Sequence, residues 1–417
     1  MKLTSLHASA GIGGYYWRDQ EAIAQGAERD GFLYRGQPVT PGFDKIIQVS
    51  STVLLTAQAD DGREIHGDCA TVNHAFRSGR QAAPVAAELI SQAEGPLSEW
   101  LLGRSLESFR KAAAQLDSIQ LHGKPLHMAM RYGMSQVLLQ AVAAHRRVTM
   151  AEVLAAEFGL KLARTPAPLL GSCGGSWYEN VDKAILRELP FFPQTAMVRL
   201  DQVDALPQYA AWIAERVRQM GSPGFAPTLH YDLHGLLSLR VKDDVDAAVK
   251  YLREVEKASG PHPVLFEDPL DAGNRGDQIA LMRELRNALR KAGSGIRLIA
   301  DEWCNTRADV EEFVGSGCCD LIQIKMPDLG GVDNTVMACM TCTQGGVGIY
   351  LGGSCNETDL SARVSSHVAL VVDPVEFLGK PGLGVDEGVM VVTNEMTRAI
   401  RSYTGRTAAP QREEATA

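Results

Sequence analysis

Hydrophobic and polar positions follow different patterns in the first 150 residues and in the rest of the chain. The segment VSSTVLLTAQADDGREIHGDCATV predicts two strands, 49–60 and 63–72, around an Asp-Gly turn. Apolar residues at helical spacing then predict helices within 84–103, 105–119 and 130–147. Strands followed by helices are typical of an α+β domain.

From about residue 165 the pattern becomes an apolar strand, a polar strand end and a helix, repeated along the chain. The predicted strands are 167–172, 195–200, 226–235, 262–270, 295–303, 320–328, 346–353 and 366–373. Eight such units fill one (β/α)₈ barrel of TIM type, an α/β fold. A doubly wound sheet is the alternative, but no G-x-G-x-x-G motif opens a helix after the first strand.

Composition narrows the class of protein. Hydrophobic residues make up 45% of the 417, which favours a large folded core, and the net charge of −9 argues against nucleic-acid or anionic-membrane partners. No signal peptide or membrane-spanning run is recognised, so we expect a cytoplasmic protein. Cys339 and Cys342 form a lone CxxC in a helical stretch, which favours a buried structural pair over a zinc or redox site.

Acidic residues stand near the carboxyl ends of three successive predicted strands: Asp232, Glu267 and Asp301. Strand ends of a barrel meet at one mouth, where active sites of this fold lie. Three carboxylates there would repel one another unless a hard cation such as Mg²⁺ were bound. The alternative is that each acid pairs with a nearby cation or caps a helix, and we favour the metal site.

Lys325 ends the next predicted strand, in DLIQIKMPDLGG, where a lysine loses hydration. Beside a metal ion and partly dry, its amine would be easier to deprotonate and could act as a base. A Lys base with Mg²⁺ is the pattern of enolase-superfamily sites, which abstract a proton next to a carboxylate. A salt-bridged core lysine is the alternative. The strand alternation would turn Gln323 and Lys325 toward the mouth and Ile322 and Ile324 outward.

Several long motifs, in order, resemble the 3-methylaspartate ammonia-lyase family of the enolase superfamily. They include RDQEAIAQGAERDGFLYRGQPVTPGF, HGDC, RYGMSQVLLQAVA, YENVDKAI, ADEWCNT, QIKMPDLGGV, GGSCNET and KPGLGVDEGVMVVTNEM. The resemblance implies an α+β capping domain over residues 1–160, a (β/α)₈ barrel over 161–390, and a C-terminal helix with a frayed tail over 391–417. It also implies a homodimer, Mg²⁺ and a stimulating monovalent cation such as K⁺.

The family reaction is the reversible loss of ammonia from threo-3-methylaspartate, which gives mesaconate. The resemblance assigns Asp232, Glu267 and Asp301 to Mg²⁺, and Lys325 to removal of the C3 proton of the (2S,3S) substrate. It assigns substrate contacts to Gln323, Ser354, Cys355, Tyr350 and Leu378. The family commonly has Thr at the place of Ser354, and Ser keeps the hydroxyl.

Three positions depart from the family pattern. Gln194 stands where the family has a histidine facing Lys325, and glutamine cannot take a proton at neutral pH. Ser172 and Asn73 each replace a family glutamine near the substrate. These changes spare the metal side, so we expect an intact proton-abstraction site with an altered substrate range or stereochemistry. His234 is a candidate replacement acid, although a supporting role is favoured.

Three functions remain open from the sequence. The first is a carbon–nitrogen lyase acting on 3-methylaspartate or a close 3-substituted aspartate. The second is another enolase-superfamily reaction, such as dehydration or epimerisation of a carboxylate substrate. The third is a barrel retained as a non-catalytic binding protein, which the retention of all three acids and Lys325 disfavours.

Overall fold

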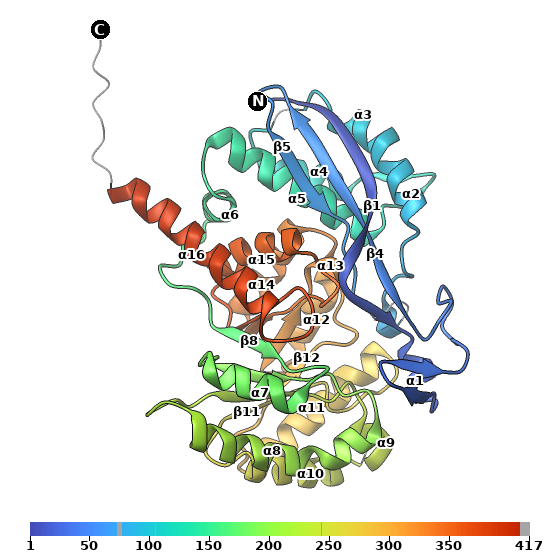
Figure 1. Ribbon diagram of the computed structural model, residues 1–417, viewed down its shortest axis with the longest axis vertical. Helices are drawn as coiled ribbons and strands as arrows, with labels where there is room; N and C mark the ends of the chain where they lie inside the picture. Colours follow the sequence, from blue (N-terminus) through green and yellow to red (C-terminus); the bar gives the residue numbers. More distant parts are fainter. Residues whose placement is uncertain (73–76, 105, 243, 409–417) are drawn as a thin grey trace.

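The computed structural model describes residues 1–72, 77–104, 106–242 and 244–408. It has two parts, a cap built from the first part of the chain and a barrel built from the rest (Figure 1). Asn73 and the predicted tail beyond residue 408 lie outside the described residues. None of the helices over the described residues is long and apolar enough to cross a membrane.

The cap is a three-stranded antiparallel sheet with helices packed on it. The sheet order is β1-β4-β5, from Leu3–Arg18, Ile47–Ala59 and Glu64–Asp68. Its helices are α1 (Gln20–Ala24), α2 (Ala86–Gln92), α3 (Ser98–Leu101), α4 (Phe109–Asp117), α5 (Met128–Arg146) and α6 (Met150–Phe158). Two small hairpins pair β2 (Glu28–Asp30) with β3 (Leu33–Arg35) and β6 (Gln120–Leu121) with β7 (Lys124–Pro125).

Eight parallel strands close the barrel in chain order. They are β8 (Leu169–Ser172), β9 (Phe191–Gln194), β10 (Thr228–Asp232), β11 (Val264–Glu267), β12 (Arg297–Ala300), β13 (Leu321–Ile324), β14 (Gly348–Leu351) and β15 (Glu376–Leu378). The helices between and after them are α7 (Trp177–Leu186), α8 (Leu200–Met220), α9 (Leu237–Val241), α10 (Val245–Ala258), α11 (Arg275–Lys291), α12 (Arg307–Ser316), α13 (Met326–Leu329), α14 (Val332–Gln344), α15 (Asp359–Val372) and α16 (Glu387–Ala408).

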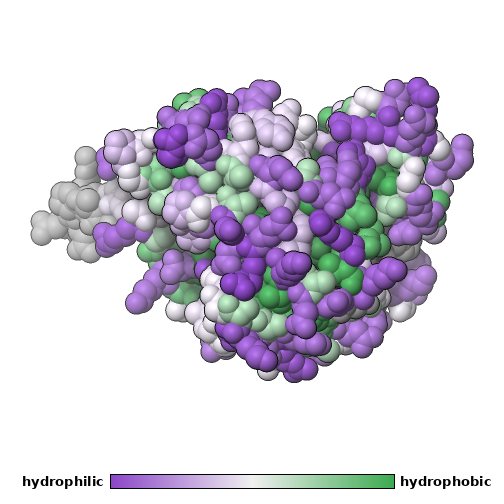
Figure 2. All heavy atoms as spheres, turned by 90° about the horizontal axis from the view of Figure 1, so that it is seen from below, coloured by the Kyte–Doolittle hydropathy of each residue, from purple (hydrophilic) through white to green (hydrophobic). Residues whose placement is uncertain are grey.

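The strand alternation of β13 shows how the barrel is packed. Leu321 points into the barrel, where it meets side chains such as Leu170 and Ile299 from other strands. Ile322 and Ile324 belong to the larger core between the strands and the helices, as the sequence predicted. Outside, the helices turn polar faces to solvent, and Figure 2 shows hydrophilic side chains over most of the face seen from below, with hydrophobic patches between them.

Six of the eight predicted barrel strands contain the observed ones, and two predictions were wrong. The second strand is β9, not 195–200, so Gln194 ends it. The apolar run at 366–373 lies in α15, because an apolar run alone does not distinguish a buried helix from a buried strand. The Thr358 capping box starts that helix, and the last strand, β15, has only three residues. The first cap strand, β1, was not predicted.

Cys339 and Cys342 both lie buried in α14 as free thiols. All eight cysteines are free and buried, which agrees with the predicted structural role of the CxxC pair.

Candidate active site

The carboxyl ends of the barrel strands surround a cavity of about 70 Å³. Of the predicted site residues, its lining contains Ser172, Gln194, Asp232, Asp301, Gln323, Lys325, Tyr350, Ser354, Cys355 and Leu378. Glu267 is not part of the lining but is buried beside it, since it pairs with Asp232 across β10 and β11. The lining residues therefore come from seven of the eight strands and the segments that follow them, and Glu267 adds the eighth, β11.

The three acids end or follow neighbouring strands, as the sequence predicted. Asp232 is the last residue of β10, Glu267 the last of β11, and Asp301 directly follows β12. All three are buried. Burial, together with the negative charges of Asp232 and Asp301, raises the pKa of Glu267 well above its ordinary value. This mutual repulsion is the electrostatic setting in which a cation would be held.

Each of the three acids bonds a nitrogen donor in this structure. Gln194 Nε2 donates to Asp232 Oδ2 at 3.0 Å, and Gln323 Nε2 donates to Glu267. The Lys325 ammonium donates to Asp301 at 2.6 Å. Across the described residues no group of three His, Cys, Asp or Glu side chains is arranged as a formed metal site. Carboxylate oxygens are suitable ligands for a hard cation. In this structure they accept hydrogen bonds from Gln194, Gln323 and Lys325 instead.

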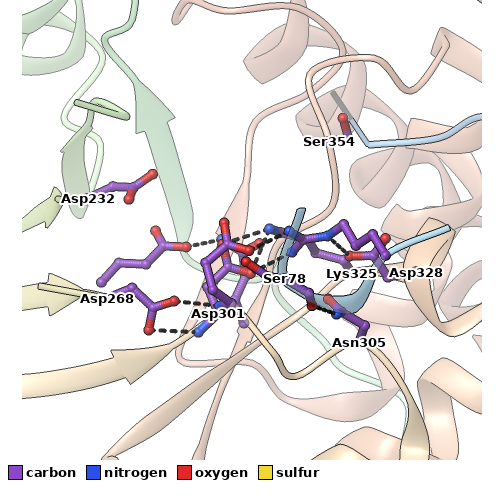
Figure 3. Close-up of polar contacts among 12 residues, drawn as sticks. Ser78, Asp232, Asp268, Asp301, Asn305, Lys325, Asp328 and Ser354 are labelled. Carbon is purple, nitrogen blue, oxygen red and sulfur yellow. Dashed lines mark hydrogen bonds and ion pairs between the residues drawn. The ribbon is translucent and has the colours of Figure 1, made fainter. Parts of the chain in front are cut away.

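Lys325 follows β13 and is buried next to Asp301 (Figure 3). Burial disfavours its ammonium form, but Asp301, with Glu302 and Asp328, raises the pKa of Lys325 above its ordinary value. The expected ease of deprotonation was tied to a neighbouring cation; in this arrangement the Asp301 carboxylate stabilises the ammonium. A cation drawing on the Asp301 carboxylate would weaken that stabilisation.

Gln194 and Lys325 face each other across the mouth. The closed strand order places three strands between β9 and β13 in either direction. Gln194 is paired with Ser172 across β8 and β9, so both departures from the family pattern lie on the same side. The Ser172 hydroxyl is buried and has no hydrogen-bond partner among the described residues.

The loop after β14 carries Ser354 and Cys355 and is fixed by a buried ion pair. Lys380 Nζ lies 2.8 Å from Glu357 Oε2 and also donates to the Gly352 carbonyl at 2.8 Å. The Ser354 N–H donates to Glu357 at 2.9 Å. Gly353 adopts φ +124°, and a Cβ there would collide with Glu357 and Lys380, so only glycine fits this turn.

Charged residues that the sequence did not single out complete the site. His230 is fully buried below the mouth, with Nε2 2.9 Å from Glu267 and Nδ1 3.0 Å from Glu376. Arg80 of the cap bonds Glu302 and Asp328 and lies 3.6 Å from Asp301. These residues carry no local motif, because their partners are 37 to 248 positions away in the chain.

His234 lines the same cavity, two residues after Asp232. Its Nδ1 lies 3.4 Å from Asp232 and its Nε2 3.4 Å from Glu302. These contacts place it beside a candidate metal ligand, as expected for a supporting histidine.

Comparisons with known proteins agree across both parts of the fold. Family models described as the N-terminus and the C-terminus of methylaspartate ammonia-lyase match residues 1–159 and 161–405. Methylaspartate ammonia-lyase 1 of Carboxydothermus hydrogenoformans is 38% identical over 405 residues, 96% of each chain. The crystal structure of the Citrobacter amalonaticus enzyme containing (2S,3S)-3-methylaspartic acid has a TM-score of 0.92 at 37% identity, covering 97% of this chain and 100% of that one.

The Mg-complex of β-methylaspartase from Clostridium tetanomorphum has a TM-score of 0.89 at 36% identity, covering 97% of this chain and 100% of that one. The sequence-based recognition and the capped-barrel prediction are thus confirmed. The chain belongs to the methylaspartate ammonia-lyase family.

Proposed function

We propose that this ammonia-lyase eliminates ammonia from threo-3-methylaspartate, or a close 3-substituted aspartate, to give mesaconate or its analogue. The observation that carries the proposal is the placement of Lys325 at a mouth that also holds three buried carboxylates. The relatives named methylaspartate ammonia-lyase, and the one whose structure contains (2S,3S)-3-methylaspartic acid, supply the substrate class.

Asp232, Glu267 and Asp301 are the residues that would hold Mg²⁺, as the Mg-complex of the Clostridium relative suggests. The ion would supply positive charge next to the substrate carboxylate that gains electron density as C3 loses its proton. Binding would draw the acids away from the amide and ammonium groups that they bond in this structure. A monovalent cation such as K⁺ stays a prediction.

In the proposed mechanism Lys325 Nζ accepts the C3 proton. The electron pair of the C3–H bond forms the new double bond, the C2–N bond breaks, and ammonia leaves. Gln323, Ser354 and Cys355 would hold substrate carboxylate oxygens, and Tyr350 and Leu378 would line the amine and alkyl side of the cavity. The Tyr350 hydroxyl and Gln323 Oε1 have no hydrogen-bond partner among the described residues, so both can bond a ligand.

Gln194 would restrict proton abstraction to one face of the substrate. It faces Lys325 across the mouth and donates a hydrogen bond to Asp232. An amide can orient a carboxylate, but it cannot accept the C3 proton from the opposite face of the substrate. Elimination would therefore be confined to the C3 epimer whose hydrogen faces Lys325.

The alternative is another reaction of the superfamily, dehydration or epimerisation of a carboxylate. Epimerisation with one base on each face has no second base at Gln194. Deuterium incorporation at the acidic carbon, without release of ammonia, would favour this alternative over the lyase.

The direct test is an ultraviolet assay of the purified protein with Mg²⁺ and threo-3-methylaspartate. We expect absorbance of the unsaturated diacid to grow with equimolar release of ammonia, and chelation of Mg²⁺ to stop both. No product from any 3-substituted aspartate would overturn the proposal. A homodimer, a cytoplasmic location and the domain boundaries at 160 and 390 stay predictions.

A further inference from the structure

A second cavity, of about 140 Å³, lies beyond the candidate active site, between the cap and the barrel. Both cavities are lined by Arg18, Ala196, Val198 and Leu383, so they adjoin. Arg18 ends the cap strand β1, and Ala196 and Val198 follow β9. The outer cavity therefore opens from the Gln194 side of the mouth.

The two cavities differ in charge. Asp232 and Asp301 line the inner one, whereas the described residues that line the outer one include three arginines and no carboxylate. Arg199 is neutralised by Asp201 at 2.6 Å. In the part of the chain that the structure describes, Arg18 and Arg29 have no such ion pair.

Arg18 is the cation shared by both cavities. Its guanidinium lies 4.9 Å from the centre of the Tyr15 ring, and its Nη2 donates to the Tyr15 hydroxyl. Its Nε is buried and bonds nothing among the described residues. A guanidinium without a carboxylate partner, in a chain of net charge −9, is a ready site for an anion.

The inner end of the path also has an unused donor. The Ser172 hydroxyl lines the inner cavity, is buried, and has no partner in the described structure. Beyond Arg18, the rings of Phe32, Tyr34 and Trp177 supply apolar walls. From Ser172 outward, the two adjoining cavities therefore offer first a hydroxyl, then the Arg18 guanidinium, and then aromatic walls.

We propose that the two cavities form one elongated site, and that Arg18 binds an anionic group at the end of a substituent on the substrate. The substrate class is then an aspartate whose amine or C3 substituent ends in a carboxylate. This inference rests on the proposed function for its inner end, where the aspartate portion would lie. Arg29 adds positive charge farther along the outer cavity.

The first experiment measures binding and needs no turnover. Calorimetry with excess Mg²⁺ compares the binding of tricarballylate and 2-isobutylsuccinate. Tricarballylate is a succinate bearing a carboxymethyl group, and 2-isobutylsuccinate bears an uncharged isobutyl group of equal size in its place. We expect tricarballylate to bind at least about tenfold more tightly if the anion is carried on carbon.

The second experiment uses the reverse reaction with mesaconate. The amine nitrogen forms a bond to C2 as the double bond is consumed, and C3 gains a proton. We compare kcat/KM for β-alanine with that for isopentylamine, which has a branched alkyl end in place of the carboxylate. At least about a tenfold preference for β-alanine is expected if the anion is carried on the amine.

Arg18→Met should bring the ratio between the anionic probe and its uncharged analogue, in affinity or in kcat/KM, to within about threefold of one. Arg29→Met should reduce the same ratio by less. Arg253→Met, on the exposed face of α10, is the matched control and should keep the preference. If Arg18→Met does not fold, Arg18→Gln carries the test and should likewise reduce the preference to within about threefold of unity. The inference is overturned if neither anionic probe is preferred, or if a preference survives in the variant that carries the test. If the wild-type protein shows no lyase activity but binds tricarballylate in a way that depends on Arg18, only the proposed function is overturned.

Discussion

The mouth of the barrel has two unlike sides. On the β13 side, Lys325, Asp301 and Arg80 form a dense set of ion pairs. On the β9 side, Gln194 and Ser172 are neutral, and Arg18 of the cap, which has no carboxylate partner among the described residues, lines the same cavity. Under the proposed mechanism, the contrast separates proton transfer from substrate selection: the β13 side would exchange the proton, and the β9 side would only bind.

Loss of Lys325 should give the largest effect, because the β9 side holds no group to replace it. Lys325→Met should lower kcat with threo-3-methylaspartate by about a thousandfold, within the range for a general base. The measurement is steady-state ammonia release. Lys250→Met, an exposed lysine on α10, is the control and should keep wild-type activity. A Lys325→Met enzyme within tenfold of wild type would contradict the assignment of the base.

Loss of a candidate metal ligand should come next. In the wild type, Mg²⁺ at about 100 times its Kd would stabilise the folded state by about 2.7 kcal/mol. Glu267→Gln should abolish most of that rise, together with activity, because two carboxylates hold the ion less well than three. Thermal unfolding with and without Mg²⁺ measures it, and the exposed Glu254→Gln on α10 should respond as the wild type does. An unchanged response in Glu267→Gln would exclude this metal site.

The buried histidine below both sides links the site to stability. Burial alone would lower the pKa of His230, but Glu376 and Glu267 raise it to about 10. Since the folded pKa exceeds the unfolded value of about 6.5, its stabilising contribution is complete below pH 6.5 and is lost as pH rises through 10.

His230→Leu should destabilise the protein by about 3–5 kcal/mol at pH 7, because two buried carboxylates lose their partner. The difference from wild type should shrink toward pH 10, as measured by denaturant unfolding at both pH values. A difference that grows with pH would refute the charged histidine.

A base introduced on the β9 side should narrow the contrast between the two sides. Gln194→His should raise activity on the erythro epimer by about tenfold or more, because an imidazole can accept a proton. Gln194→Leu removes the amide without adding a base and should show no such gain. Equal gains in the two variants would mean that the size of the side chain at position 194, not its basicity, determines activity on the erythro epimer.

The sequence predicted the β13 side better than the β9 side for a physical reason. Glu267 ends a short apolar strand, and Asp301 and Lys325 directly follow one, so local pattern and barrel geometry together place them at the mouth, as they do Asp232 next to β9. Phe191–Gln194 contains a proline, and β9 was therefore misplaced by several residues. Arg80 and His230 come into place through contacts distant in the chain, and Arg18 lines the mouth only because the cap strand β1 reaches the barrel, which no local pattern encodes.

The central claim, that only Lys325 exchanges a proton with the substrate, is tested most directly by deuterium exchange at C3. Both C3 epimers of 3-methylaspartate are incubated with enzyme and Mg²⁺ in D₂O and followed by NMR. We predict C3 exchange or elimination for the threo epimer alone, and neither in Lys325→Met. Comparable exchange of both epimers, or exchange that survives in Lys325→Met, would contradict the claim.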